Sequence, residues 1–355
     1  MTWEVGLVYH QDFQKYDLGE EHPFRGERYP KAMGFFETVG VLDKVRLFTP
    51  EPVEEQNVLI VHTPDFVGRI RELNRKGGPL TGDTYVFPGL YDIARLFAGS
   101  NLLAGELILT NQCQRAVVFG LGGHHAGAGY GGGFCIINDV AIMVELLKRK
   151  YHLRRILVFD YDAHCGNGCQ DIFYQDPQVL YIDFHQDPRT LYPGVGFIHE
   201  IGEGPGLGYT VNVPLPPGTT DASYLKAVHE ILVPLAEEYK PELIIALGGV
   251  DSHFQDPLSN LNISLNGFRT IVEALSEISM LRSDGRFVLI GSSGYNVNLL
   301  PKGWYALLCG VIGLKDVLFK ESEPIPDEPD NVRALISKVI KEVRKTHASY
   351  WSSLR

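Results

Sequence analysis

The sequence of 355 residues lacks several features that mark specialised classes of protein. It has no stretch of about 18 apolar residues, and its first residues show no basic segment followed by an apolar run. A membrane span and a secretion signal are therefore not expected, and the predicted location is cytoplasmic. The five cysteines are scattered and odd in number. They fit neither a disulfide framework nor a zinc ribbon.

Positive charge is also scarce, with 32 Lys and Arg residues against 43 Asp and Glu and a formal net charge of -11. A nucleic-acid partner or an anionic membrane surface is therefore not expected, and cationic substrates are mildly favoured. No linker, repeat or abrupt change of composition divides the chain. We therefore expect a single domain over residues 1–355.

Short apolar runs alternate with longer amphipathic stretches, a pattern typical of an α/β protein whose parallel sheet is covered by helices. The expected strands are residues 57–61, 116–120, 156–160, 179–184, 243–247 and 287–290. The expected helices are residues 138–150, 221–239, 266–281 and 330–346. Asn138 and Asp139 would cap the first helix, and Pro234 should kink or shorten the second.

Chemically distinctive side chains follow four of these expected strands. They are His124, His125, Asp160, Asp162, His164, Asp251 and Tyr295. Because ligands of parallel α/β sheets bind outside the carboxyl ends of the strands, we expect these side chains at one edge of the sheet.

Asp162 and His164 are two residues apart, so on an extended segment they point the same way and can bind one ion. Asp251, preceded by two glycines, is the best candidate for a third ligand. Two carboxylates and one imidazole leave coordination positions open, as catalytic sites do, and they suit Zn²⁺ first and Fe²⁺ second. A hydrogen-bonded pair at a strand end is the commoner fate of an isolated Asp-x-His, so convergence of the strands carries the metal hypothesis.

His124 and His125 are candidates for proton transfer beside such a metal, because imidazoles gain and lose protons near pH 7. A capping pair after a strand is the ordinary alternative. Tyr295 follows a Gly-Ser-Ser-Gly turn and is a candidate electrophilic hydroxyl. An exposed loop tyrosine is the ordinary alternative there.

Several motifs together resemble the superfamily of histone deacetylases, acetylpolyamine amidohydrolases and acetoin utilization proteins. They are GGHHA at 122–126, GGGFCIIND at 131–139, DYDAHCGNG at 160–168, GGVDSHFQDPL at 248–258 and GSSGYN at 291–296, with further matches at 22–28 and 202–218. The resemblance covers residues 8–315 in the right order. It implies the arginase-deacetylase fold, a single α/β domain with a central parallel sheet of about eight strands flanked by helices.

The resemblance implies hydrolysis of an N-acylated amine, such as acyl-lysine, by a metal-activated water. The implied metal ligands are Asp162, His164 and Asp251. The implied catalytic residues are His125 as general base and acid with Asn167 behind it, His124 as electrostatic partner with Asp160 behind it, and Tyr295 as the group that polarises the carbonyl.

The resemblance also implies a narrow substrate channel. Its residues are Phe134 and Tyr192 as walls, Gly133 as the residue that keeps it open, Asp83 as a rim residue that grips backbone amides, Leu258 at the rim, and Arg28 in an internal channel that releases acetate. Leu258 stands where some polyamine-selective relatives have a glutamate. Acyl-lysine is therefore expected to be at least as good a substrate as acetylspermidine.

The sequence departs from the family pattern at three places. Cys165 replaces a usual second histidine, Asp183 replaces a serine that binds a monovalent cation, and Ser292 and Ser293 replace glycines. These changes keep every group that the chemistry needs, but they leave open whether a structural K⁺ binds.

Other functions compete with this interpretation. Residues 127–132 read Gly-x-Gly-x-x-Gly, which suggests dinucleotide binding, but the motif does not follow its strand directly as a Rossmann fingerprint does. A deacetylase of acetylpolyamines or other small N-acyl amines is the main alternative. A non-catalytic sensor of acyl ligands is a further alternative, although the histidines, metal ligands and tyrosine are all intact.

Overall fold

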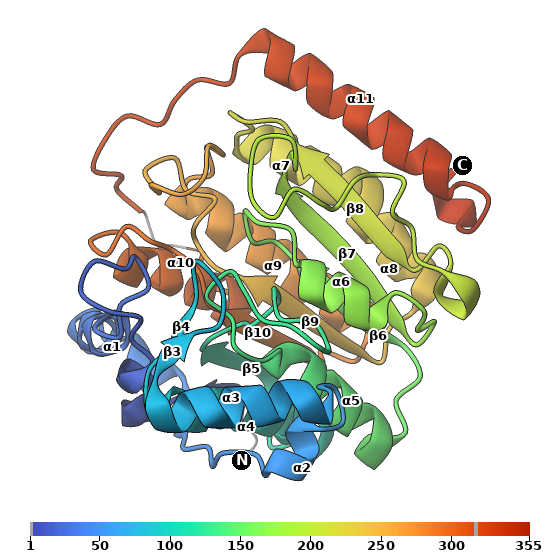
Figure 1. The fold of residues 1–355 in the computed structure, drawn as a ribbon. Coiled ribbons are helices and arrows are strands. Elements are labelled where there is room, and N and C mark those ends of the chain that lie inside the picture. The colour runs from blue at the N-terminus through green and yellow to red at the C-terminus, as the bar shows by residue number, and fades with distance from the viewer. Residues whose placement is uncertain (1–2, 316–318) are drawn as a thin grey trace. The chain divides into compact units, whose positions relative to one another are not determined.

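The computed structural model describes residues 3–315 and 319–355. Its main sheet has eight strands in the order β2-β1-β5-β10-β9-β6-β7-β8, and helices flank it (Figure 1). The strands are β1 Trp3–Val8, β2 Arg46–Phe48, β5 Cys113–Phe119, β6 Ile156–Asp160, β7 Val179–Gln186, β8 Thr210–Leu215, β9 Leu243–Gly248 and β10 Phe287–Gly291. A separate antiparallel pair consists of β3 Gly78–Pro79 and β4 Tyr85–Val86. The expected α/β class with an eight-stranded parallel sheet is confirmed.

The described residues group into two compact units. The first comprises the residues up to Leu153 together with Asn167–Ile172 and Val288–Ser292. The second comprises Arg154–Gly166, Phe173–Phe287 and the chain from Ser293 onward.

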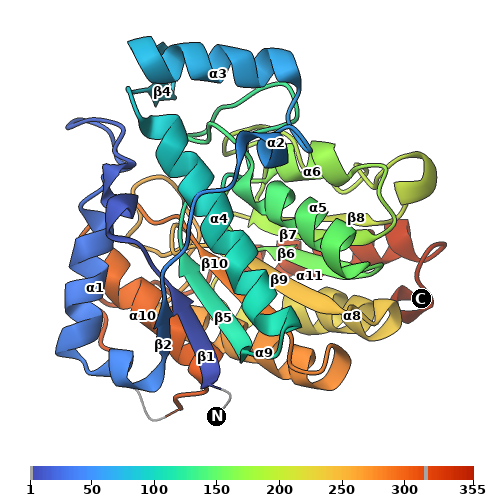
Figure 2. The same cartoon turned by 90° about the horizontal axis from the view of Figure 1, so that it is seen from below.

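In the first unit, β1 pairs in parallel with both β2 and β5. Helix α4, Leu90–Leu109, runs across β1 and β5 (Figure 2). Helix α5, Asp139–Tyr151, packs on α4. Gly105 permits this close packing, because a Cβ there would lie 2.4 Å from the Leu147 side chain. The other helices of this unit are α1 Arg28–Thr38, α2 Glu55–Val58, α3 Pro64–Lys76 and α6 Asn167–Phe173, whose last residue belongs to the second unit.

In the second unit, β9, β6, β7 and β8 pair in parallel in that order. Every residue of these four strands is buried. Burial on both faces explains the apolar runs of β6, β9 and the first part of β7. Helix α11, Asp330–His347, packs along β8 (Figure 1). The other helices are α7 Asp221–Ala227, α8 Val233–Tyr239, α9 Leu265–Arg282 and α10 Leu300–Ile312.

Most of the predicted elements are confirmed. Strands were predicted within a few residues of β5, β6, β7, β9 and β10, and helices close to α5, α9 and α11. The Asn138 side chain caps α5 as expected and accepts a hydrogen bond from the Ala141 amide at 2.8 Å. The predicted helix 221–239 continues through Pro234, but a π-helical turn at Val228–Leu232 separates α7 from α8.

The predicted strand 57–61 is wrong. These residues form the end of α2 and the turns that follow it, with hydrogen bonds from the Val61 and His62 amides to the Val58 carbonyl. Val58 is buried whereas Leu59 is exposed, so only one side of this turn contacts the core. A short apolar run does not distinguish a buried strand from a helical turn, and here Thr63 and Pro64 immediately begin α3.

None of the helices in the described ranges is both long and apolar enough to cross a membrane. All five cysteines lie in those ranges, are buried and form no disulfide. The strands β1, β2 and β8 were not predicted from the sequence.

Candidate active site

The loop after β6 and the loop after β9 place three potential metal ligands together in the second unit. Ligand atoms of Asp162, His164 and Asp251 all lie within 4.8 Å of one another. Nδ1 of His164 lies 2.9 Å from Oδ2 of Asp251 and 3.1 Å from Oδ1 of Asp162. We call these three residues the metal-centre cluster.

The metal-centre cluster is buried and rich in negative charge. Asp251 is wholly buried, and its burial together with the nearby Asp162 carboxylate raises the pKa of Asp251 to about 7. Burial lowers the pKa of His164, but hydrogen bonds with Asp162 and Asp251 outweigh it and raise that pKa to about 10. Each shift shows that these groups favour an added positive charge between them.

The donor set fits a divalent cation. Two carboxylates and an imidazole nitrogen point at one another, and a cation balances the two carboxylate charges. The other carboxylate contacts hold the ligands in place, because Asp251 Oδ1 accepts the Ala163 amide at 3.1 Å and Asp162 Oδ1 accepts the His164 amide at 2.9 Å. Supported ligands of this kind are typical of protein metal sites.

The first unit holds the two predicted catalytic histidines in the loop after β5. The rings of His124 and His125 lie 4.0 Å apart between centroids, and both residues are buried. The loop is anchored by Asp139, whose carboxylate accepts the Gly123 amide at 2.5 Å and the Gly122 amide at 3.3 Å. Burial raises the pKa of Asp139 to about 6, and these hydrogen bonds oppose the shift.

Two neighbours define the position of the His125 ring. Nδ1 of His125 lies 2.8 Å from Oδ1 of Asn167. Gly133 lies on another side of the ring, because a Cβ at Gly133 would be 2.3 Å from Cδ2 of His125. Glycine is therefore required at 133 both for space and for its positive φ of 53°.

Other predicted channel residues surround Gly133 in the same unit. Oδ2 of Asp83 accepts the Gly133 amide at 3.1 Å, so this carboxylate contacts a backbone amide of its own chain. The Phe134 amide donates to Oγ1 of Thr84 at 3.0 Å, and the Phe134 carbonyl accepts the Tyr16 hydroxyl at 2.8 Å. The loop that carries Phe134 is thus held from two sides.

The remaining predicted channel and carbonyl-binding residues belong to the second unit. The ring of Tyr192, which is 45% exposed, lies 6.5 Å from the His164 ring. The Tyr295 amide donates to Oδ2 of Asp256 at 2.6 Å, and the Leu258 amide donates to Oδ1 of the same carboxylate at 3.0 Å. Asp256 therefore links the Tyr295 loop to the segment of Leu258.

Arg28, predicted for an internal channel, is almost completely buried in the first unit. Its guanidinium lies 3.8 Å from the Phe24 ring centroid and donates to backbone carbonyls, among them that of Ser292 at 3.2 Å. A buried arginine that binds carbonyl oxygens suits an internal polar passage, and that role stays a prediction.

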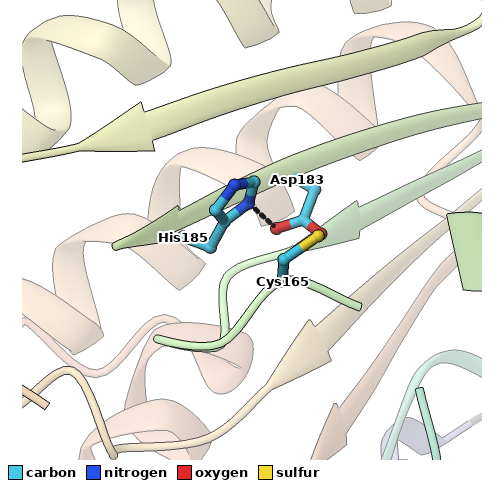
Figure 3. A group of neighbouring side chains, drawn as sticks. All are labelled: Cys165, Asp183 and His185. Atoms are coloured by element: carbon cyan, nitrogen blue, oxygen red, sulfur yellow. Dashed lines mark hydrogen bonds and ion pairs between the residues drawn. The ribbon is translucent and has the colours of Figure 1, made fainter. Parts of the chain in front are cut away.

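A second cluster of potential ligands lies in the same unit as the metal-centre cluster. Cys165, Asp183 and His185 are all buried and bring their donor atoms within 4.8 Å of one another (Figure 3). One oxygen of Asp183 lies 2.7 Å from Nδ1 of His185. Nε2 of His185 lies 2.9 Å from the Gly196 carbonyl, to which it donates. We call these three residues the second cluster.

The second cluster can balance its own charge. Burial lowers the pKa of His185, but the Asp183 carboxylate outweighs it and raises that pKa. An imidazolium beside one carboxylate is neutral overall. Burial and the nearby Asp183 carboxylate raise the pKa of Cys165 well above its usual value, so the thiol stays protonated.

Asp160, predicted behind His124, is the last residue of β6, two residues before Asp162. Its Oδ2 accepts the Tyr181 hydroxyl at 2.8 Å, and the same hydroxyl lies 3.1 Å from Asp183. Asp160 and His124 belong to different units, so the pairing of the two stays a prediction. The structural K⁺ stays a prediction too.

Sequence reasoning missed three supporting residues, which are Asp139 as an anchor, Asp256 and Tyr181. The sequence identifies Asp139 only as a helix cap. In the structure its carboxylate also holds the loop of Gly122 and Gly123. Asp256 lies inside the motif 248–258, but its contact with the Tyr295 amide joins segments 39 residues apart, and no local pattern predicts that contact. Tyr181 had no sequence signal, because it resembles any aromatic residue of a buried strand.

Comparison with known proteins places these observations in a family. The model of the histone deacetylase domain matches residues 22–311. A probable deacetylase of Archaeoglobus fulgidus is 35% identical over 99% of both chains, and the acetoin utilization protein AcuC of Bacillus subtilis is 32% identical over 84% of this chain and 79% of that protein. The crystal structure of the HDA15 HD domain superposes with a TM-score of 0.88 at 25% identity, covering 99% of this chain and 97% of that one. The chain belongs to the histone deacetylase family.

Proposed function

We propose that this chain is a metal-dependent amidohydrolase that removes an acyl group from an N-acylated amine such as acyl-lysine, with residues 1–355 acting as one catalytic domain. The observation that carries the proposal is the metal-centre cluster, because two buried carboxylates and an imidazole face one another at the ends of two strands. Membership of a deacetylase family supports the same reaction class.

Asp162, His164 and Asp251 would hold the metal, for which we propose Zn²⁺ first and Fe²⁺ second because both bind imidazole together with carboxylate. When bound, such an ion polarises a carbonyl and makes water more acidic. The rest of the chemistry belongs to the protein's own side chains.

His125 would take a proton from the attacking water at Nε2 and deliver it to the departing amine. Its Nδ1 faces the Asn167 side chain, which leaves Nε2 for this task. His124 would act through its charge, with Asp160 behind it. The hydroxyl of Tyr295 would donate a hydrogen bond to the carbonyl oxygen as negative charge develops there.

Phe134 and Tyr192 would line the path of an extended acyl chain, and Asp83 and Leu258 would lie at its rim. An apolar Leu258 offers no attraction to a second positive charge, which favours acyl-lysine over acetylpolyamines. Acetylpolyamines and other small N-acyl amines are the alternative substrate class.

The test is a substrate screen on the protein loaded with Zn²⁺ or Fe²⁺, comparing acyl-lysine peptides of different acyl length, acetylspermidine and other small N-acyl amines. Release of carboxylate and amine from an acyl-lysine peptide is the expected result. A strong preference for acetylspermidine would overturn the substrate assignment, and no hydrolysis of any amide by the metal-loaded protein would overturn the function.

Two variants assign the histidine roles in the same assay. His125→Ala should be nearly inactive but should retain its metal, because His125 moves the proton and does not hold the ion. His124→Ala should lose less activity, since its role is electrostatic. The reverse ranking would show that the two roles are exchanged.

A further inference from the structure

The glycine-rich segment at residues 127–132 has no role in the mechanism above, yet it places one side chain against the catalytic machinery. The hydroxyl of Tyr130 accepts a hydrogen bond from Nδ2 of Asn167 at 3.2 Å and donates to Oδ2 of Asp171 through a short hydrogen bond. Asn167 in turn faces Nδ1 of His125 at 2.8 Å. All four residues belong to the first unit.

The backbone is built to hold Tyr130 in this position. Gly127 and Tyr130 form an isolated antiparallel bridge, and a Cβ at Gly127 would lie 2.3 Å from the Tyr130 ring. Asn167 and Asp171 are four residues apart on α6, so their side chains lie on one face of that helix. Gly127 therefore makes room for the aromatic ring of Tyr130.

The hydrogen bonds that connect Asp171, Tyr130, Asn167 and His125 have only one consistent set of donors and acceptors. Asp171 is a carboxylate and only accepts, so the single proton of the Tyr130 hydroxyl points toward it. The Tyr130 oxygen is then an acceptor, and it takes the NH₂ group of Asn167. This fixes the amide so that its carbonyl oxygen faces His125 and accepts the proton of Nδ1.

We propose that Tyr130 and Asp171 are positioning residues that hold His125 in the Nδ1–H tautomer by fixing the orientation of the Asn167 amide. An amide turned by 180° would present its NH₂ group to Nδ1 and force the proton onto Nε2. His125 could then no longer accept a proton at Nε2. The inference rests on the proposed function of His125 as the base, and it explains how the neutral amide of an asparagine can fix the tautomer of this imidazole.

Asn167→Asp provides the decisive background for a test. A carboxylate accepts the Nδ1 proton with either oxygen, so the tautomer of His125 no longer depends on Tyr130 or Asp171. Tyr130→Phe and Asp171→Asn should each lower kcat in the Asn167 protein with KM and metal content unchanged, and should add no further loss in the Asn167→Asp protein.

We expect a loss of about tenfold for Tyr130→Phe, because the freed amide samples both orientations, whereas a fully wrong tautomer costs about 10⁴-fold in a catalytic triad. Tyr350→Phe is the matched control. Tyr350 is similarly exposed, and it is far in sequence from the hydrogen-bonded group of Tyr130, Asn167 and Asp171. The control should match the wild type in kcat and in melting temperature.

The tautomer itself gives a readout that needs no activity. Nitrogen NMR of histidine-labelled, Zn²⁺-loaded protein, with the signal of His125 identified by its loss in His125→Ala, should show the Nδ1–H form in the wild type and a mixed form in Tyr130→Phe. A wild-type protein without amidase activity would remove the proposed function but would leave this measurement valid.

The proposal is overturned if Tyr130→Phe keeps the wild-type tautomer. Equal losses of kcat in the Asn167 and Asn167→Asp backgrounds would also overturn it, because they would show an effect that does not pass through the amide. A lower melting temperature of Tyr130→Phe with an unchanged tautomer would assign Tyr130 to packing alone.

Discussion

Two Asp-x-His pairs in this chain have the same local geometry but different third partners. Asp162 and His164 are joined by the carboxylate of Asp251, whereas Asp183 and His185 are joined by the thiol of Cys165. Both clusters are buried, and both place Nδ1 of the histidine near a carboxylate oxygen, at 3.1 Å and 2.7 Å respectively. The difference between them lies in charge.

The metal-centre cluster holds two carboxylates for one imidazole, so with both carboxylates ionised it stays negative even when the imidazole is protonated. The second cluster holds one carboxylate for one imidazole and is neutral when that imidazole is protonated. A buried charge without a counterion costs far more than a paired one. The comparison therefore suggests that charge balance, more than the presence of donor atoms, separates the metal site from a structural ion pair.

The largest expected effect comes from removing a ligand of the metal-centre cluster. Asp162→Ala, His164→Ala and Asp251→Ala should each lose stoichiometric metal and all measurable turnover, because a site with three ligands does not keep its geometry with two. Metal content by mass spectrometry and the amidase assay measure both.

Cys165→Ser is the matched control from the second cluster, and it should keep a single bound ion per chain. Two ions per wild-type chain, falling to one in Cys165→Ser, would show that the second cluster binds metal and would break the comparison. Full metal content in any of the three alanine variants would remove that residue from the site.

The next largest effect should be on stability and should come from the second cluster. Asp183→Ser leaves the His185 imidazole buried without its carboxylate, which should cost about 3–5 kcal/mol in the free energy of unfolding, as the loss of one partner of a buried pair does. Urea unfolding measures this change, and metal content should stay constant.

Asp92→Ser is the reference variant, because it removes one partner of an exposed ion pair instead of a buried one. Asp92 pairs with Arg95 at 3.0 Å but is 56% exposed, so its loss should cost less than about 1 kcal/mol. If Asp183→Ser costs no more than Asp92→Ser, the pair of Asp183 with His185 does not stabilise the fold.

Two tyrosines allow the same comparison between a group proposed for the reaction and a group that supports the fold. Tyr295→Phe should lower turnover by a factor of about 10² to 10³, or roughly 2.7 to 4 kcal/mol, because it deletes one donor to the developing oxyanion. Its metal affinity should hardly change, and a hydroxamate inhibitor should bind within a modest factor of the wild type. Turnover within a few-fold of wild type would reduce Tyr295 to an ordinary loop aromatic.

Tyr181→Phe should show the opposite profile. Its hydroxyl is buried between the carboxylates of Asp160 and Asp183, so its loss should cost about 1–3 kcal/mol of stability. Turnover should fall far less than in Tyr295→Phe. Equal losses of turnover in the two variants would show that the polar groups behind the metal-centre cluster are as important as the carbonyl donor.

The two Asp-x-His pairs also show how far sequence reasoning reaches. The spacing of two residues predicts that Asp162 and His164 point the same way, and the structure places Nδ1 of His164 3.1 Å from Oδ1 of Asp162. The same spacing at Asp183 and His185 was not recognised in the sequence, although these side chains also meet, at 2.7 Å. The third partner comes from elsewhere in the chain, and Asp251 was found because it follows its own strand. No similar signal identifies Cys165 as the neighbour of Asp183, because a cysteine next to a histidine in a loop has many other fates.

The fold was predictable where burial on both faces produces long apolar runs, as in β6, β7 and β9. It was not predictable where the run is short, as in β2 with its exposed Arg46 and Leu47. The wrongly predicted strand 57–61 failed for the related reason that four apolar residues also make one helical turn. Asp256 and Tyr181 were missed because their roles arise only when distant segments pack together.

The smallest expected effect is a pH dependence confined to the metal-free protein. Asp251 has a pKa of about 7 in the folded chain, well above that of an unfolded aspartate, so the proton it binds stabilises the fold at low pH. This stabilisation is complete below the pKa of the unfolded group and is lost as pH rises through about 7. Between pH 6 and pH 8 the loss should be roughly 1 kcal/mol, on the order of one proton bound over one pH unit. Other groups contribute a pH dependence of their own, and His185 with its raised pKa loses stabilisation in the same direction.

The quantity to measure is therefore the difference in the free energy of unfolding between the chelated wild type and chelated Asp251→Asn, whose amide at 251 does not titrate. With metal bound, the ion replaces the proton, and the wild type should lose this pH dependence. If the metal-loaded wild type keeps the same pH dependence as the chelated wild type, the ion does not bind Asp251, and the contrast between the two clusters does not rest on charge.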